Sequence, residues 1–376
     1  MDPFLENLLW TLFGAIIGIV IARPVQRYQQ ALKYWFRGVI ARFRRIDIVA
    51  VAQDEFRIDK WHVGWVIIEG SSSDPYIPNN VVCQVDPTPL MLPPDRQRKK
   101  EQIEETQAQR EKDHKSREFH NGATVALAGV GRGQMGYTEE PFLRLRLRPS
   151  DYYTFLATAM SLDEVIATGG EGSITIRDKY LRNLNYKSPI PEFASAVSIN
   201  LSLITSDGFI VVSKRASEGI GGYQDYLAPP INECINPVAD SISGTVSLLA
   251  TARRGATQEL NIEITEDELV FFTVGVDTHW YFYAVTGLIR SKSFSRDDIL
   301  GRRSLGSKER WESTQLYFLP HDLEEAARFM RDTTRTDKWN PEGVVCLTQT
   351  LMLEFGKKAT ERALKKYPPV RSQYWI

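Results

Sequence analysis

The chain has 376 residues, enough for about two domains of the usual 100–200 residues. Its 46 basic and 47 acidic residues give a net charge of −1, which excludes the overall basic field of many nucleic-acid-binding proteins. No nucleic-acid polymer is therefore expected as a partner. The cysteines at 83, 234 and 346 match no metal spacing and favour a reducing compartment without a disulfide framework.

The first long apolar run, LLWTLFGAIIGIVIA at residues 8–22, contains no charged side chain. Extended back to Leu5, at about 1.5 Å per residue it would cover roughly 27 Å, close to the ~30 Å hydrocarbon core of a bilayer. Acidic Asp2 and Glu6 precede the run and several arginines follow it. The positive-inside rule then predicts a single-pass anchor in residues 1–24, with the N-terminus outside and the body cytoplasmic. The alternative is a buried or interfacial helix.

Small residues lie on one face of this run. Gly14 and Gly18 form a Gly-x-x-x-Gly pattern, with Ala22 one further turn on. Such a face lets helices approach closely in lipid, so we expect contact with membrane lipid and a homo-oligomer. Glycine is also common in membrane helices generally, so the spacing could arise by chance.

The next segments carry few chemical signals. Residues 25–45 are basic and amphipathic, which predicts a juxtamembrane helix. Residues 46–190 are expected to form a β-rich spacer or N-terminal extension. Within this spacer, residues 95–118 are almost wholly polar or charged, which predicts a solvated helix or a disordered excursion. Expected strands lie at 61–69, 123–130 and 142–148, and an expected helix at 151–159.

The C-terminal part, residues 191–376, has the texture of a packed domain. An apolar hairpin, 197–204 and 209–214, is expected around the turn sequence Ser-Asp-Gly. Further strands are expected at 269–276, 280–289 and 316–319, and helices at 246–260, 322–331, 342–355 and 357–366.

One stretch in this part, TARRGATQELNI at residues 251–262, resembles the tail of a Nudix box, Arg-Glu-aliphatic-x-Glu-Glu-x-Gly-aliphatic. The order of expected strands and helices over residues 197–355 is also similar to a Nudix domain. The resemblance implies a Nudix-like α/β/α sandwich at 191–376. The fold class expected for the whole chain is α+β: a single transmembrane helix, a juxtamembrane helix, the β-rich spacer and then this sandwich.

The box is degenerate. Active Nudix enzymes use clustered carboxylates to hold divalent cations against a diphosphate. Here Arg254 and Glu259 match the pattern, whereas the other key positions depart from it: Gly255 and Gln258 replace glutamates, Asn261 replaces a glycine, and Asp240 and Val246 stand where the leading glycine and another glutamate belong. We therefore expect no catalytic residue, metal or cofactor. The alternative is a membrane-tethered Nudix hydrolase of nucleoside diphosphate derivatives.

A cleft of this type could still bind a nucleotide. Basic side chains could pair with phosphate, aromatic rings could stack on a base, and polar side chains could contact a base edge or ribose. The candidate residues are Lys214, Arg215, Arg253 and Arg254 for phosphate, Tyr223, Tyr226 and Trp280 for stacking, and Asn232, Glu233 and Glu259 for polar contacts. Structural roles compete with each assignment, such as an ion pair of Arg254 with a nearby acid.

The combination of an anchor with a degenerate Nudix-like domain resembles the transmembrane-Nudix effectors of cyclic-oligonucleotide antiphage signalling (CBASS). That resemblance implies a domain that binds a cyclic nucleotide or another nucleotide second messenger. The resemblance also implies a location in the bacterial inner membrane, where binding would drive oligomerisation and membrane disruption. A scaffold that binds no small molecule is a further alternative.

Overall fold

The computed structural model describes residues 55–368, apart from 59–60, 114–118, 136–139, 170–171, 183, 218–221 and 308–311. The chain divides into two compact units, and the described residues belong to the second, Gln53–Trp375. Everything below concerns that unit.

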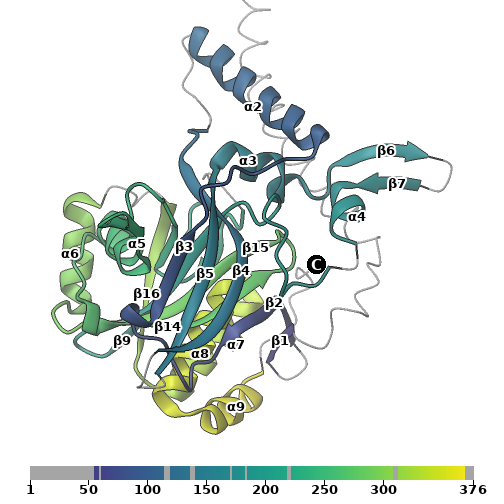
Figure 1. Ribbon diagram of the computed structural model, residues 1–376. Helices are drawn as coiled ribbons and strands as arrows, with labels where there is room; N and C mark the ends of the chain where they lie inside the picture. Colours follow the sequence, from purple (N-terminus) through teal and green to yellow (C-terminus); the bar gives the residue numbers. More distant parts are fainter. Residues whose placement is uncertain are drawn as a thin grey trace, which may run out of the picture. The chain divides into compact units, whose positions relative to one another are not determined.

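A ten-stranded mixed sheet forms its centre (Figure 1). The central strand β8 (Val197–Ile204) is wholly buried and pairs in parallel with β15 (Phe282–Arg290). The strand order is β1 (Glu55–Ile58), β2 (Trp61–Gly70), β14 (Leu269–Asp277), β15, β8, β9 (Phe209–Arg215), β10 (Tyr226–Ala228) and β17 (Lys338–Trp339), while β11 (Ile231–Cys234) pairs with β8 and β16 (Ser313–Pro320) with β9.

Helices cover both faces of this sheet, and the alternation of strand side chains shows which face each helix covers. In β8, the Ser202 hydroxyl contacts Cys346 of α8 (Pro341–Phe355), so even-numbered residues face α8. In β11, Ile231 lies opposite Leu201 and packs against Gly255 of α5 (Leu248–Gly255), so the odd-numbered face belongs to α5. These two faces are called the α8 face and the α5 face below.

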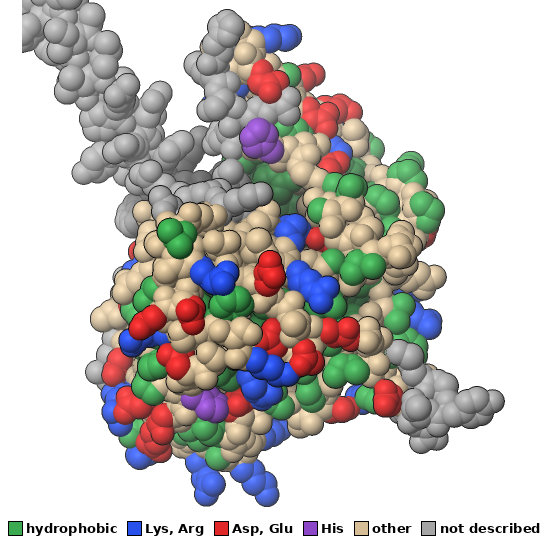
Figure 2. Space-filling view, turned by 90° about the vertical axis from the view of Figure 1, so that its left-hand side faces the viewer, with side chains coloured by type: hydrophobic (Ala, Val, Ile, Leu, Met, Phe, Trp, Pro, Cys, Tyr) green, Lys and Arg blue, Asp and Glu red, His purple; other side chains and the backbone are tan. Residues whose placement is uncertain are grey.

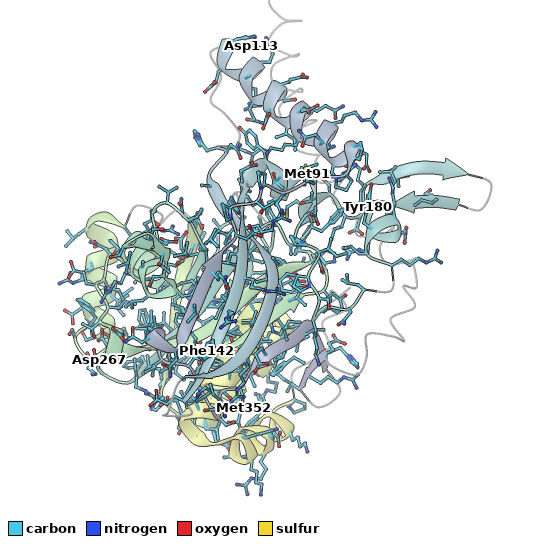
Figure 3. All side chains as sticks on the ribbon, viewed as in Figure 1. Met91, Asp113, Phe142, Tyr180, Asp267 and Met352 are labelled. Atoms are coloured by element: carbon cyan, nitrogen blue, oxygen red, sulfur yellow. The ribbon has the colours of Figure 1, made fainter. Side chains whose placement is uncertain are left out.

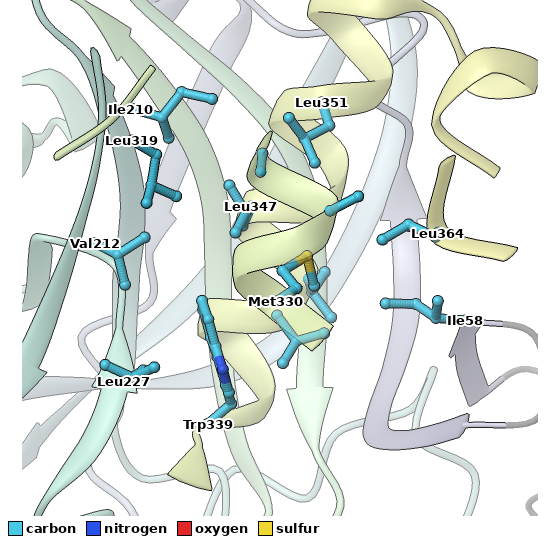
Figure 4. Packing of buried hydrophobic residues seen from close by; sticks show 14 of the residues in the cluster. Ile58, Ile210, Val212, Leu227, Leu319, Met330, Trp339, Leu347, Leu351 and Leu364 are labelled. Atoms are coloured by element: carbon cyan, nitrogen blue, oxygen red, sulfur yellow. The ribbon is translucent and has the colours of Figure 1, made fainter. Parts of the chain in front are cut away.

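The largest apolar cluster lies on the α8 face (Figure 4). Leu347 and Leu351 of α8 pack there with Met330 of α7 (Leu323–Thr336) and Leu364 of α9 (Lys357–Lys366). Full burial of such side chains stabilises the fold by about 1.5–3 kcal/mol each. The sheet and α8 are therefore a rigid base for any site built at their ends.

The remaining elements lie mostly outside the large sheet. A three-stranded sheet joins β3 (Val81–Val85), β5 (Glu140–Asp151) and β4 (Ala123–Met135), and α3 (Tyr152–Ala157) follows it directly. Two short hairpins pair β6 (Val165–Gly169) with β7 (Gly172–Thr175) and β12 (Ser241–Ile242) with β13 (Thr245–Val246). Two further helices are the short α4 (Ile176–Tyr180) and the longer α6 (Arg296–Gly306). Acidic and basic side chains are interspersed on the face shown in Figure 2, which gives that face no field of a single sign.

The charged segment expected at 95–118 is a helix over most of its length, α2 (Pro94–Lys112). Its first turns are anchored, because buried Arg96 donates to the Ala157 carbonyl at 3.1 Å and Tyr180 donates to Asp95 at 2.6 Å. Figure 3 labels Tyr180 near this anchored end and Asp113 at the other. The solvated-helix prediction is thus confirmed for α2, with ion pairs fixing one end.

Most of the expected elements are confirmed, including the hairpin β8–β9, the strands β14 and β15, and the helices α7, α8 and α9. The helix expected at 246–260 begins at Leu248 and ends as a π-helical turn at Ala256–Leu260. The α+β class is wrong, because parallel and antiparallel pairs share one sheet and the architecture is mixed α/β. Strands β1 and β2, from the segment expected as a spacer, belong to this same sheet.

The membrane prediction also needs correction. Within the described part of the chain, no helix combines the length and apolar character needed to cross a bilayer. The 19-residue α2 is highly charged, and the apolar α8 has only 15 residues, below the roughly 20 that a span requires. This finding contradicts the predicted single-pass fold and inner-membrane localisation. The run at residues 5–22, with Gly14, Gly18 and Ala22, and the helix expected at 25–45 lie outside the described residues.

Candidate functional site

The sheet forks beside β8, and the candidate residues lie around this fork. Strand β9 pairs with β8 only at Leu203 and Ile204, whereas β11 takes the same edge of β8 at residues 198–201. Between them the chain leaves β10 and enters β11 through Pro229 and Pro230, which lack N–H donors for a ladder. The Ser213 hydroxyl is within hydrogen-bond distance of the Ala228 and Pro229 carbonyls, at 3.2 and 2.9 Å. The β9–β10 and β8–β11 ladders therefore diverge from a fixed point.

Arg254 of the degenerate box lies on the α5 face with every guanidinium N–H group engaged. Its Nε and Nη2 donate to the two carboxylate oxygens of Asp240 at 2.7 and 2.9 Å, and Nη2 also donates to the Cys234 carbonyl at 2.6 Å. Its Nη1 lies 2.5 Å from Glu233 and donates to Gln258 at 3.3 Å. The residue that stands in place of the leading box glycine, Asp240, is fully buried and pairs with this arginine. Arg254 is thus a structural bridge between β11 and α5.

Glu259, the one box carboxylate retained, is also held by the protein. Its Oε1 accepts the Asn232 backbone N–H at 2.7 Å, which satisfies a donor of β11. Burial raises the pKa of Glu259 well above its ordinary value, although the Asn232 hydrogen bond acts in the opposite direction. Among the residues that the structure describes, no three His, Cys, Asp or Glu side chains are placed to hold a metal.

The divalent cations that a Nudix resemblance implies do not fit these residues. Hard cations prefer several ionised oxygen ligands each. Glu259 is the one carboxylate of the pattern that this sequence keeps, and it is buried with a raised pKa, while Asp240 and Glu233 are paired with Arg254. We therefore derive no step through a metal here.

Arg215, at the end of β9, contrasts with Arg254. Within the described part of the chain its half-buried guanidinium has no hydrogen bond and no ion pair. It nevertheless lies close enough to Glu259 and Glu342 for its charge to lower both of their pKa values, against the larger effect of burial. Arg215 is therefore an uncommitted cation in reach of both carboxyl groups.

Two buried acids, Asp277 and Glu342, lie on the α8 face. Asp277, fully buried at the end of β14, accepts hydrogen bonds from the Tyr223 hydroxyl and from the backbone N–H groups of His279 at 2.7 Å and Trp280 at 3.3 Å. Burial raises its pKa. Glu342, in the first turn of α8, has a pKa raised to about 8 by burial and by the nearby Asp277 charge. At neutral pH the site therefore holds at least one carboxyl that is largely neutral.

Aromatic side chains pack beside these acids. The Tyr223 ring lies 5.1 Å from the Tyr226 ring and 6.2 Å, edge-on, from the Trp280 ring, measured between centroids. Tyr223 and Tyr281 both have a positive φ, 60° and 53°, a region that non-glycine residues seldom adopt. Bulky residues in that region frequently mark functional sites, because the surrounding structure must hold them there.

The structure gives different surroundings to the other residues expected at the site. Lys214 is committed to Asp337 at 2.7 Å and Asp225 at 3.3 Å, and Arg253 donates to the Ile264 carbonyl at 3.2 Å. Asn232 lies directly opposite Asn200, which places its side chain on the α8 face, whereas Glu233 faces Arg254. Around the fork, the expected residues Arg215, Tyr223, Tyr226, Trp280 and Asn232 therefore remain as candidates for contact with a ligand.

Sequence reasoning missed three residues of this region. Asp277 directly follows the strand expected at 269–276 and Glu342 begins the helix expected at 342–355, and the sequence indicates burial at neither position. Tyr152, from α3, lies close enough to Arg215 for that charge to oppose the effect of burial, which raises the Tyr152 pKa. The one signal present in the sequence is an acid at a helix start directly before an apolar run, as in Asn-Pro-Glu at 340–342.

No protein-family model matches the sequence, and no curated protein does. Among solved structures, DR0079 from Deinococcus radiodurans matches 50% of this chain and 96% of its own, at 16% identity and a TM-score of 0.27. A bifunctional NMN adenylyltransferase/ADP ribose pyrophosphatase from Francisella tularensis matches 43% of this chain and 42% of its own, at 12% identity and 0.26. A MutT/nudix family protein from Enterococcus faecalis matches 46% and 81%, at 9% and 0.25. The neighbours thus include Nudix/MutT proteins, but likeness of this degree establishes neither membership of that family nor an activity.

Proposed function

We propose that this chain binds a nucleotide-derived ligand at the fork and does not cleave it, with Arg215 as the phosphate contact. The observation that carries the proposal is the uncommitted guanidinium of Arg215 next to carboxyl groups whose pKa values burial raises. Because Arg215 forms no ion pair with the described residues, its guanidinium is available to an anion. A guanidinium suits phosphate oxygens, which it can bind in a bidentate manner.

The interactions of Glu259 and Arg254 do not favour hydrolysis as the main activity. Glu259 uses its carboxylate to accept a backbone donor, and Arg254 is saturated by Asp240, Glu233, Gln258 and Cys234. A Nudix-type reaction would need ionised carboxylates at these positions. The chain would instead serve as a sensor, in which binding of a cyclic nucleotide or related messenger favours the assembly of several copies of the chain. Such a switch requires differential affinity for the two states, of a few kcal/mol.

Thermal unfolding of the full chain tests the proposal. A ligand of the native state raises Tm, so we expect at least one member of a panel of nucleoside diphosphates, cyclic dinucleotides and cyclic trinucleotides to do so. Arg215→Ala should abolish that shift with the Tm of the free protein unchanged, since the side chain makes no hydrogen bond or ion pair with the described residues. Arg253→Ala, which removes an exposed arginine outside the fork, should keep the shift.

Two results would overturn the proposal. One is a panel in which no nucleotide changes Tm. The other is Mg²⁺-dependent turnover of a nucleoside diphosphate derivative that Glu259→Gln abolishes, because that loss would identify Glu259 as catalytic and favour the hydrolase alternative.

A further inference from the structure

Glu342 is a buried carboxyl with an unused oxygen. The side chain belongs to a residue only 3% exposed, and its Oε2 has no hydrogen-bond partner within the described structure. Nearly all buried polar groups in folded proteins are hydrogen-bonded, because an unpaired one loses its water contacts without compensation. A residue that carries such a penalty needs a reason to be retained.

The neighbouring groups on the α8 face do not supply that partner. Asp277 is itself an acceptor and takes the available Tyr223 hydroxyl. Asn200 of β8 adds a second buried acceptor, Oδ1, that no donor of the described residues reaches. Its backbone carbonyl lies 3.3 Å from Cys346 of α8, one helical turn after Glu342, so both acceptors lie between α8 and the sheet. Two buried oxygens in this region, Glu342 Oε2 and Asn200 Oδ1, therefore have no partner among the described residues.

A structural glutamate in the same protein looks quite different. Glu268 is 5% exposed, and both of its oxygens are in use. Oε2 accepts the backbone N–H and hydroxyl of Thr265 at 2.8 and 3.0 Å, and Oε1 accepts the Lys292 backbone N–H at 2.6 Å. At similar burial, Glu268 is satisfied by the fold and Glu342 is not.

Strained backbone adjoins Glu342. Tyr223 lies close enough to Asp277 and Glu342 for their charges to add to the effect of burial, which raises the Tyr223 pKa. Its φ is 60°, and that of Asp225, two residues later, is 62°. The ring of Tyr223 packs beside that of Tyr226. The segment thus offers flat aromatic surface next to unsatisfied acceptors, which suits a planar group that carries N–H donors.

We propose that Glu342 is a ligand-binding residue whose unused carboxyl oxygen accepts a hydrogen bond from an N–H group of a nucleobase, while Arg215 binds the phosphate of the same molecule. This inference rests on the proposed function and adds which chemical group lies at the other end of the ligand. Glu342 is retained for binding at the expense of stability, as functional polar groups in cores often are.

The test compares Glu342→Met with Glu268→Met in the full chain. Methionine is similar in size to glutamate and has no carboxyl oxygens. We expect the free Glu342→Met protein to melt at the same temperature as the wild type or higher, and Glu268→Met to melt lower, because it strands three donors. Calorimetric titration with GDP, ADP, UDP and CDP should show at least a tenfold weaker Kd for Glu342→Met with the best of these probes. Glu268→Gln should bind as the wild type does.

The outcomes separate the inference from the proposed function. If Glu342→Met melts as far below the wild type as Glu268→Met, then Glu342 is structural and the inference is overturned without any ligand. If Arg215→Ala abolishes binding and Glu342→Met binds normally, the inference fails while the proposed function stands. If no nucleotide binds the wild type, both fail.

Discussion

Polar groups on the two faces of the central sheet differ in how completely they are hydrogen-bonded. On the α5 face, Arg254 uses every guanidinium donor and Asp240 is fully buried against it, so the stretch that resembles a Nudix box is a closed hydrogen-bond network. On the α8 face, Glu342 and Asn200 each retain an unused acceptor, and Arg215, an odd-numbered residue at the end of β9, has no hydrogen bond or ion pair with the described residues. The contrast shows that the residues matching the motif are engaged within the fold, whereas polar groups without a partner remain on the α8 face and at the end of β9.

The largest effect should come from breaking the closed network. Arg254→Ala leaves the buried carboxylate of Asp240 without its cation, and loss of one partner of such a pair typically costs about 3–5 kcal/mol. Urea denaturation should therefore show a free energy of unfolding lower by about that amount. The adjacent Arg253→Ala is the matched control and should change it by less than about 0.5 kcal/mol, as at most surface sites. Equal stability of the two variants would contradict a framework role for Arg254.

The next largest effect should be a dependence of the free energy of unfolding on pH, caused by Glu342 on the α8 face. Burial and the Asp277 charge raise the pKa of Glu342 from 4.5 to about 8, so the native state keeps a proton that the unfolded state releases. Between those values stability must fall as pH rises, and the contribution is fully present below about pH 4.5. Each unit of pKa shift corresponds to about 1.4 kcal/mol.

The measurement is thermal unfolding at pH 5 and pH 9 for the wild type and Glu342→Met. Burial raises the pKa values of Glu259 and Asp277 as well, so the variant should keep part of the decline in Tm. The wild type should decline more. Parallel declines would show that Glu342 does not hold its proton in the native state, and would remove the main electrostatic difference between the two faces.

A smaller effect is expected at Tyr223. Its hydroxyl donates to buried Asp277, and Tyr223→Phe would leave that carboxylate with only the two backbone donors of His279 and Trp280. Loss of a hydrogen bond to a charged group typically costs about 1.5–3 kcal/mol, and the raised pKa of Asp277 reduces that toward about 1 kcal/mol. Equilibrium denaturation should detect the difference. A Tyr226→Phe variant tests whether any aromatic hydroxyl in the segment matters equally.

Much of the fold could be predicted from the sequence, and much less of the site. Alternating and continuous apolar runs located β8, β9, β14 and β15, because period and burial appear directly in residue order. The role of Glu342 could not be predicted, because an acid in the first turn of a helix is ordinarily a solvated residue that favours the helix dipole. Nor could the sequence distinguish the role of Arg254 from that of Arg215. Both are arginines beside expected acids, and only the partners of each, set by the divergence of β9 from β11, distinguish a bridge from an uncommitted cation.

The smallest effect should be that of Glu259→Gln, and it is the sharpest test of what the box has become. Glutamine keeps an oxygen that can accept the Asn232 backbone N–H, and burial already raises the pKa of Glu259, so the substitution replaces a mostly neutral acid with a neutral amide. The free energy of unfolding should change by less than about 1 kcal/mol, whereas Glu259→Ala strands the Asn232 donor and should cost about 1–3 kcal/mol. A loss of stability in Glu259→Gln as large as in Glu259→Ala would mean that the ionised carboxylate is required. Glu259 would then remain available as a metal ligand. The hydrogen-bond network on the α5 face would no longer be an argument against catalysis.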